Sequence, residues 1–152
     1  MVYFLLSRIG IVYYLYPMKN TFVIIISIFI VTSCRYTNKE LKEHIINTDS
    51  IAINYFPGDG TMDTVVAVKI IREKKNIEQL ATFVAARSTA EKYNCGVDGS
   101  LHFFKMSKVI QDVDFRMNAG DCMHFSFLQK GELKTSVLTN EAKELLTALK
   151  NK

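Results

Sequence analysis

The segment VIQDVDFRM, residues 109–117, decides the fold because its apolar and charged side chains alternate. The apolar members share one parity and the charged members share the other: Val109, Val113, Phe115 and Met117 against Asp112, Asp114 and Arg116. Successive side chains of a β-strand point to opposite faces, so this strand would bury one face and expose the other to water. The segment therefore predicts a sheet that is covered on one side.

Three further segments around this strand have a similar character. Residues 100–106, 122–129 and 132–138 each form a short run of strand-forming residues between turn residues. The connections between the four segments are only a few residues long, a length that antiparallel neighbours allow and parallel neighbours do not. The sequence therefore predicts an antiparallel meander of four strands between residues 100 and 138.

A hairpin precedes the meander. Ile51, Ile53 and Tyr55 occupy alternate positions, and the turn sequence PGDG follows at residues 57–60. Residues 64–71 are then rich in β-branched side chains, which favour strands. We expect two paired strands here.

Two amphipathic helices complete the expected domain. The first is predicted over residues 76–90, where Asn76 and Gln79 have the spacing of a capping box, and the second follows Thr139 as its N-cap. Each carries one apolar stripe at helical spacing: Ile77, Leu80, Ala81 and Val84 in the first, and Ala142, Leu145, Leu146 and Leu149 in the second. The order β-β-α-β-β-β-β-α predicts an α+β domain, an antiparallel sheet with the helices packed on one face.

The N-terminal part has a different character. An apolar run over residues 22–31 follows Lys19 and ends at Val31-Thr32-Ser33-Cys34, where small residues precede a cysteine. This arrangement resembles the signal peptide and lipobox of a bacterial lipoprotein. The resemblance implies that residues 18–33 are a signal peptide, that cleavage occurs before Cys34, and that acyl chains on this cysteine anchor the protein in a bilayer.

The residues before Met18 fit this pattern poorly. Residues 1–17 form a second apolar run, interrupted by Arg8 and without a cleavage site. We interpret them as an upstream extension or an extra apolar segment, and expect Met18 to be the true start. The alternative is an uncleaved transmembrane anchor, but neither run reaches the roughly 20 apolar residues that a spanning helix needs. Joining the runs would place Lys19 inside the membrane at a high cost.

The resemblance also bears on location. The chain is similar in style to small lipoproteins of Bacteroidota, and Arg35 stands where enterobacterial lipoproteins retained in the inner membrane carry an aspartate. This favours the periplasmic face of the outer membrane. Residues 34–47 would form a tether and a short helix beginning at Asn38, ahead of a single domain over residues 48–152. Without the leader the formal charge falls from +4 to +2, so no nucleic-acid partner is expected.

The cysteine count agrees with an extracytoplasmic location. If Cys34 is acylated, Cys95 and Cys122 remain as an even pair in an oxidising compartment, where a disulfide can persist. Such a bridge would tie the turn after the first long helix to the third strand of the meander. The alternative is a pair of buried free thiols.

Few residues of the domain suggest chemistry. His102 and His124 lie on predicted strands with one strand between them, and that strand carries Asp112 and Asp114. These four residues define an alternative function, that of a small envelope enzyme. Metal-binding spacings such as HxH or HExxH do not occur, and no serine lies in a GxSxG motif. We therefore expect no catalytic residue, no metal and no cofactor.

Phe103 and Phe104 give the best hint of a contact surface. Adjacent residues of a strand point to opposite faces, so one of the two rings should be exposed unless another segment, such as residues 38–47, covers it. The aromatic residues of the meander otherwise suit a core. The sequence thus favours a non-catalytic binding or inhibitor module, with the bilayer and an envelope protein as its partners.

Overall fold

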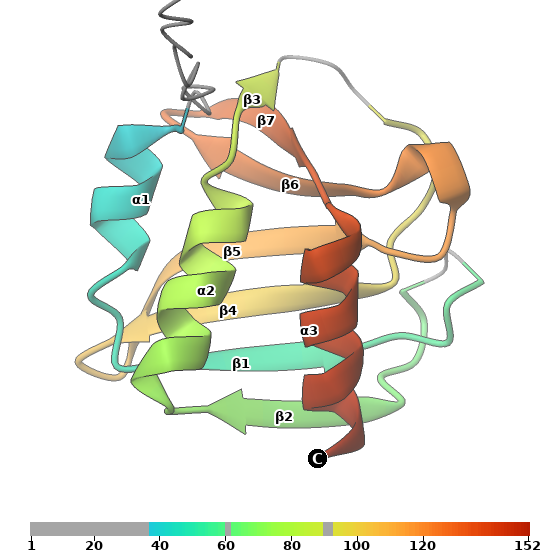
Figure 1. The fold of residues 1–152 in the computed structure, drawn as a ribbon, viewed down its shortest axis with the longest axis horizontal. Coiled ribbons are helices and arrows are strands. Elements are labelled where there is room, and N and C mark those ends of the chain that lie inside the picture. The colour runs from blue at the N-terminus through green and yellow to red at the C-terminus, as the bar shows by residue number, and fades with distance from the viewer. Residues whose placement is uncertain (1–36, 60–61, 90–92) are drawn as a thin grey trace, which may run out of the picture. The chain divides into compact units, whose positions relative to one another are not determined.

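The computed structural model describes residues 37–59, 62–89 and 93–152. Seven strands form one sheet in the order β2-β1-β4-β5-β6-β7-β3, and every neighbouring pair is antiparallel. The three α-helices all lie on one face of this sheet (Figure 1). The predicted α+β fold with helices on one face is therefore confirmed. The strands are β1 (Ser50–Tyr55), β2 (Ala67–Ile71), β3 (Ser88–Thr89), β4 (Gly99–Lys105), β5 (Lys108–Arg116), β6 (His124–Gln129) and β7 (Glu132–Val137), and the helices are α1 (Lys39–Ile45), α2 (Lys74–Val84) and α3 (Asn140–Asn151), with a 3-10 turn η1 (Gly120–Cys122).

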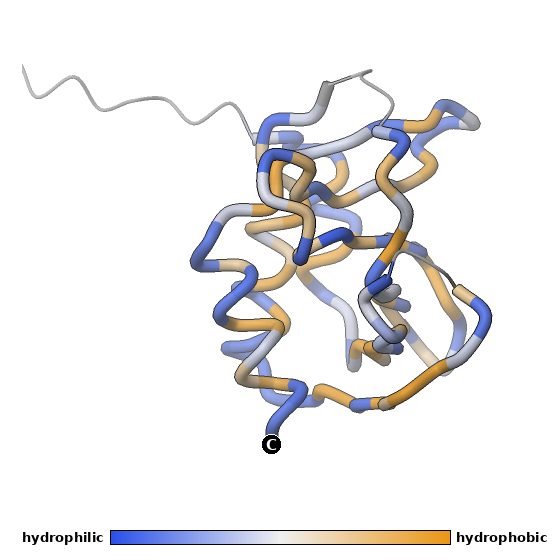
Figure 2. The backbone as a smooth tube through the Cα atoms, turned by 90° about the vertical axis from the view of Figure 1, so that its right-hand side faces the viewer, coloured by the Kyte–Doolittle hydropathy of each residue, from blue (hydrophilic) through white to orange (hydrophobic). Residues whose placement is uncertain are grey.

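Side-chain caps begin two of the helices where the sequence predicts them. Asn38 Oδ1 accepts a hydrogen bond from the Leu41 N–H at the start of α1 (3.1 Å), and Thr139 Oγ1 accepts one from Ala142 at the start of α3 (3.3 Å). These contacts satisfy backbone donors that the first turn of a helix leaves unpaired. Figure 2 shows hydrophobic and hydrophilic residues alternating along the helix that ends at the C-terminus, as its amphipathic pattern requires.

Helix α2 differs from its prediction at both ends. It begins at Lys74 with Glu73 as N-cap, and Asn76 lies inside the first turn, where its Nδ2 donates to Glu73 Oε2 (2.8 Å). It ends at Val84 rather than near Ala90, because Ser88 and Thr89 form the short strand β3 against β7. The predicted cap at Asn76 and the predicted helix end are therefore wrong.

The core lies between the helices and the inner face of the sheet. Tyr55, Phe103, Phe115 and Phe125 are its largest fully buried side chains. The Tyr55 hydroxyl donates to the Leu146 carbonyl of α3 (2.7 Å), and the Tyr55 ring meets Phe115 edge to face with centroids 5.9 Å apart. The apolar residues of α1 also belong to this core, so α1 is part of the packed domain.

A β-bulge changes the parity of β5. Phe103 pairs with Gln111 and Phe104 pairs with Val109, so Ile110 is an extra residue between the two pairs. Val113 and Phe115 are buried, as predicted, but Val109 lies beyond the bulge and is 46 % exposed. The prediction that Val109 shares their buried face is therefore wrong.

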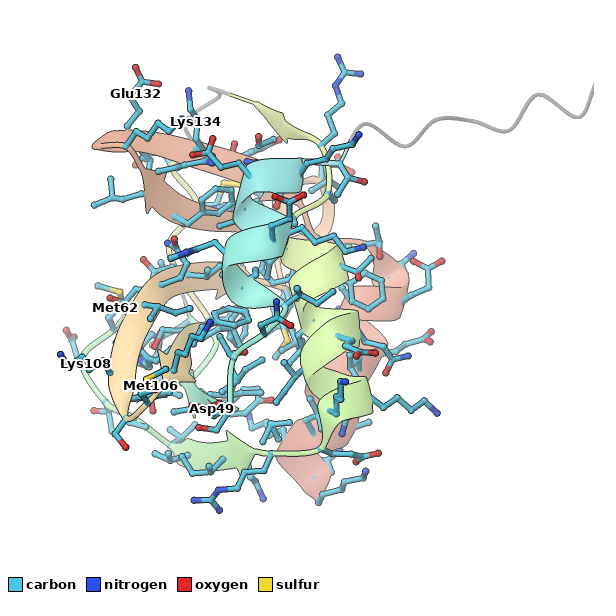
Figure 3. The ribbon with its side chains drawn as sticks, turned by 90° about the vertical axis from the view of Figure 1, so that its left-hand side faces the viewer. Asp49, Met62, Met106, Lys108, Glu132 and Lys134 are labelled. Carbon is cyan, nitrogen blue, oxygen red and sulfur yellow. A yellow bond between two sulfur atoms is a disulfide. The ribbon has the colours of Figure 1, made fainter. Side chains whose placement is uncertain are left out.

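Two hairpins of the meander close with two-residue turns. Met106 and Ser107 have φ angles of 48° and 61°, and Lys130 and Gly131 have φ angles of 53° and 78°. Positive φ at both turn residues matches the right-handed twist of the flanking strands. The first turn contains no glycine and is held by a hydrogen bond from the Met106 N–H to Asp49 Oδ2 (2.6 Å), two residues that lie close together in Figure 3.

Two links fix the segment that enters β4: a disulfide and a buried ion pair. Cys95 and Cys122 form a disulfide with Cα atoms 6.4 Å apart, which confirms the predicted pair. The buried Asp98 carboxylate forms an ion pair with Arg116 Nη1 and accepts hydrogen bonds from the Met117 and Asn118 N–H groups, both at 2.8 Å. These contacts join the segment before β4 to η1 and to the end of β5.

The predicted signal peptide, residues 18–33, the preceding segment 1–17 and the lipidation site Cys34 all lie outside the described residues. No helix within the described ranges is long and apolar enough to cross a membrane.

Candidate functional site on the outer face of the sheet

The polar side chains of three adjacent strands gather on the outer face, the face of the sheet opposite the helices. His102 of β4 lies directly across from Asp112 of β5, and Ser100 lies across from Asp114. On the other side of β4, Asn54 of β1 lies across from Ser100. Directly opposed residues of an antiparallel pair point to the same face, so register alone brings these five side chains together.

His102 is at the centre of a chain of hydrogen bonds. Its Nδ1 lies 2.6 Å from Asp112 Oδ1, and its Nε2 lies 3.0 Å from Ser100 Oγ and 3.0 Å from Asn54 Nδ2. The carboxylate can only accept, so Nδ1 is the donor in this contact and a neutral ring offers Nε2 as an acceptor. A serine, a histidine and an orienting aspartate in this order have the connectivity of an activated nucleophile.

A groove of about 350 Å³ borders this cluster where β5 faces β6 and β7. Asp112 and Asp114 supply its charge, and neither Ser100 nor His102 lines it. Its apolar walls are largely exposed: Val109 (46 %), Leu128 (63 %) and Leu133 (43 %). The groove therefore combines two carboxylates with open apolar surface.

The two carboxylates are not neutralised by strong cations. Burial, and then the negative charge of Asp112, raise the pKa of Asp114, and the positive charges of His102 and His124 lower it only in part. Within the described part of the chain, the ion pair of Asp112 is with His102, and no lysine or arginine pairs with either carboxylate. A cation placed in the groove would relieve this repulsion.

His124 does not join His102. It is 4 % exposed, its Nδ1 lies 2.8 Å from the Cys122 carbonyl, and its ring stacks on Tyr93 with centroids 4.5 Å apart. Of the four residues in the predicted alternative, the structure bonds His102 to Asp112, places Asp114 beside them, and holds His124 by other contacts.

The predicted contact surface of Phe103 and Phe104 separates into two environments. Phe103 is fully buried in the core cluster, to which Leu41 and Ile45 of α1 also belong, so the segment after Asn38 packs on the inner face and does not cover the ring on the outer face. Phe104 is half-buried on the outer face opposite Val109. Phe103 is therefore a core residue, and only Phe104 can contribute to a surface.

Ser100 and Asn54 were missed by sequence reasoning. A single serine or asparagine on a strand has no motif, and its role here depends on which residues face it across the sheet. The only signal was parity, because Ser100 and His102 are two residues apart on one strand and must share a face.

No group of three or more histidine, cysteine, aspartate or glutamate side chains in the described ranges is arranged to hold a metal ion. Comparison of the chain with protein families, with curated proteins and with solved structures finds no match.

Proposed function

We propose that the protein is a periplasm-facing lipoprotein, anchored in the outer membrane by acyl chains on Cys34, whose domain is a non-catalytic binding module. The lipobox Val31-Thr32-Ser33-Cys34 supports the anchor. The Cys95–Cys122 disulfide supports an oxidising compartment, where such bonds persist. Mass spectrometry of the protein extracted from membranes tests the anchor: acyl mass on an N-terminal Cys34 is expected, and an unmodified Cys34 in an uncleaved chain would exclude it.

The groove on the outer face binds a lysine or arginine side chain of an envelope protein. The observation that carries this is the position of Asp112 and Asp114 between exposed apolar walls. Long cationic side chains bury their aliphatic stems on apolar surface and keep the charged head on a polar partner. The stem would lie on Leu128 and Leu133, and the head would reach the two carboxylates.

Charge complementarity decides the partner's chemistry. Asp114 is half-buried and lies beside a second carboxylate, and its pKa is raised first by burial and then by the negative charge of Asp112. A charge-assisted hydrogen bond contributes about 1.5 to 3 kcal/mol, which corresponds to roughly a tenfold or larger change in affinity. Arginine can bond a carboxylate through two parallel N–H groups, so we expect it to bind more tightly than lysine.

A short peptide probe tests this assignment. The full-length protein in neutral detergent micelles is titrated with N-acetyl-Leu-Arg-Leu-amide, while NMR follows the backbone amides of Ser126 and Leu128. Saturable shifts are expected with this peptide and not with its glutamate analogue. Asp112→Asn and Asp114→Asn should each weaken binding about tenfold or more.

Asp121→Asn is the matched control, because Asp121 is exposed in η1 and the substitution changes the same charge away from the groove. Equal binding by the arginine and glutamate peptides, or equal weakening by all three substitutions, would refute a specific cation site.

A second candidate function is hydrolysis of an ester or amide with Ser100 as the nucleophile. The hydrogen-bond chain from Ser100 through His102 to Asp112 favours it. Binding is the better-supported function because Ser100 is only 7 % exposed and does not line the groove. The groove that a substrate could enter therefore does not contain the nucleophile. Treatment with a fluorophosphonate separates the two: an adduct on Ser100 that His102→Ala abolishes would establish the hydrolase, and an unmodified Ser100 would exclude it.

A further inference from the structure

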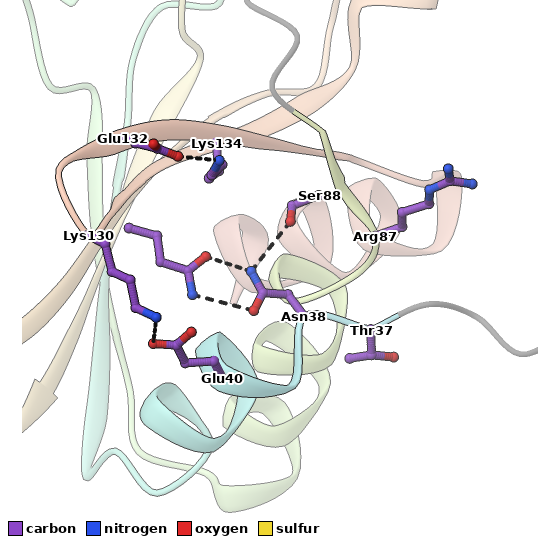
Figure 4. A pocket seen from close by; sticks show the side chains of 9 residues that line it. Thr37, Asn38, Glu40, Arg87, Ser88, Lys130, Glu132 and Lys134 are labelled. Carbon is purple, nitrogen blue, oxygen red and sulfur yellow. Dashed lines mark hydrogen bonds and ion pairs between the residues drawn. The ribbon is translucent and has the colours of Figure 1, made fainter.

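A polar cavity of about 620 Å³ lies at the opposite end of the domain from β2, between the start of α1, strand β3 and the β6–β7 hairpin (Figure 4). Its charged lining consists of three cations, Arg87, Lys130 and Lys134, and two carboxylates, Glu40 and Glu132. It is separate from the groove of the outer face and shares no residue with it.

The inner wall of the cavity is held in place by an amide network. Asn38 Nδ2 donates to Gln129 Oε1 (2.8 Å) and lies 3.4 Å from Ser88 Oγ, while Asn38 Oδ1 caps α1. The Asn38 N–H also donates to the Ala85 carbonyl (2.8 Å). One residue thus joins α1 to β3 and β6, so the cavity wall is formed before any ligand arrives.

The lysines at this wall are held by exchangeable partners. Lys130 Nζ lies 2.9 Å from Glu40 Oε1, and Lys134 Nζ lies 2.6 Å from Glu132 Oε2. Glu40 and Glu132 are 61 % and 71 % exposed at the side chain. Exposed pairs of this kind contribute about 0 to 1 kcal/mol, so a stronger anion can displace both carboxylates into water at little cost.

The position of the cavity along the chain identifies the anion. Thr37 lines it, three residues after Cys34, and a fully extended chain spans at most about 3.6 Å per residue. A lipid anchor on Cys34 would therefore keep the cavity within about 11 Å of the bilayer surface. This step rests on the proposed lipid anchor.

We infer that the cavity binds the phosphate of an anionic phospholipid headgroup in the membrane that holds Cys34. The phosphate oxygens would replace the Glu40 and Glu132 carboxylates on Lys130 and Lys134, and Arg87, which extends outward at the rim, would meet the surface beside it (Figure 4). The domain is thereby held with this edge toward the bilayer and its groove free for a protein partner. The interaction weakens with salt because it is a contact between exposed charges.

Lysine reactivity measures occupancy of the cavity. The full-length protein is reconstituted in vesicles of phosphatidylcholine, with or without 30 % phosphatidylglycerol (about a third of the lipid, enough to give a negative surface potential). Acetylation of each lysine by an amine-reactive ester is followed by peptide mass spectrometry. Lys130 and Lys134 should react several-fold more slowly in the anionic vesicles, and high salt should remove the difference.

Lys74 is the reference lysine, because it also pairs with a glutamate, Glu78, and begins α2 beside β2, at the other edge of the sheet (Figure 1). Its rate should not depend on lipid composition. Trypsin cleavage after Arg87 provides a second readout, and it should also depend on lipid composition. The double substitution Lys130→Gln and Lys134→Gln should abolish this dependence, and Lys74→Gln should preserve it.

Two outcomes would overturn the inference. One is equal acetylation of Lys130 and Lys134 in both vesicle types. The other is equal protection in neutral vesicles by inorganic phosphate at the same phosphate concentration, which would assign the site to a free anion. The mass of the Cys34 peptide in the same digests reports the anchor separately, so failure of the anchor and failure of the headgroup site are distinguishable.

Discussion

Removal of the Asp98 carboxylate should be among the most damaging single changes in the domain. Asp98 is 1 % exposed and Arg116 has a side chain only 12 % exposed, and Arg116 Nε already has no hydrogen-bond partner. Asp98→Ala would leave this guanidinium without a counter-charge and two backbone N–H groups, of Met117 and Asn118, without their acceptor. Breaking one side of a buried ion pair costs about 3 to 5 kcal/mol, so we expect a loss of about 4 kcal/mol.

Two further substitutions divide that loss into its parts. Asp98→Asn keeps an oxygen for the two N–H groups but loses the charge and the oxygen that accepts from Arg116 Nη1, so it should cost less than Asp98→Ala. Combining Asp98→Asn with Arg116→Gln should recover stability, because neither buried group is then charged.

Urea unfolding with the disulfide intact, followed by circular dichroism, measures these differences. A loss of about 4 kcal/mol would remove a large share of the 5 to 15 kcal/mol typical of a domain and lower the urea midpoint by more than about 1 M. Asp121→Asn, at an exposed position, should change stability by less than about 0.5 kcal/mol. A loss below about 1 kcal/mol for Asp98→Ala would refute the argument that this carboxylate is a structural centre.

Three other variants test the fold and the groove. Replacing Cys95 and Cys122 by serine should lower the free energy of unfolding by about 3 kcal/mol, as measured by chemical denaturation. Without the disulfide the unfolded chain has more conformational entropy, because the loop between the two positions is no longer closed. Gly99→Ala should cost more than about 2 kcal/mol in the same assay, because a methyl group would overlap the Phe115 ring and the neighbouring backbone; an unchanged midpoint would contradict this packing. Asp114→Asn should raise the melting temperature at pH 7, because the raised pKa means that Asp114 supports folding below its ordinary pKa and loses that contribution as pH rises through the raised value; the gain should vanish in acid, and a gain that persists there would refute the sign.

Local pattern was sufficient for much of the fold. The alternation of Val113 and Phe115 and the caps at Asn38 and Thr139 each depend on neighbours within a few residues, and the structure confirms them. The end of α2 could not be predicted in this way, because β3 exists through its pairing with β7, more than forty residues later in the chain (Ser88 with Ser136).

The hydrogen-bond chain of the candidate site could not be predicted from the sequence for a related reason. The chain from Ser100 to Asp112 exists because β4 and β5 pair in one register, and the bulge at Ile110 sets that register. A bulge leaves no motif in the sequence, since any residue can be the extra one. The sequence predicted His102, His124 and the two aspartates on neighbouring strands, but it could not show that Ser100 completes the chain or that His124 is bonded elsewhere.

The turn at Met106 and Ser107 is less stable than the same turn would be with other residues. A left-handed backbone costs a residue other than glycine roughly 1 kcal/mol, and the turn demands it twice. Met106→Asn with Ser107→Gly would supply the residues that such turns prefer. Replacing the natural pair should therefore raise the free energy of unfolding. The change lies at a hairpin tip, away from Cys95, from the groove and from the cavity beside Thr37.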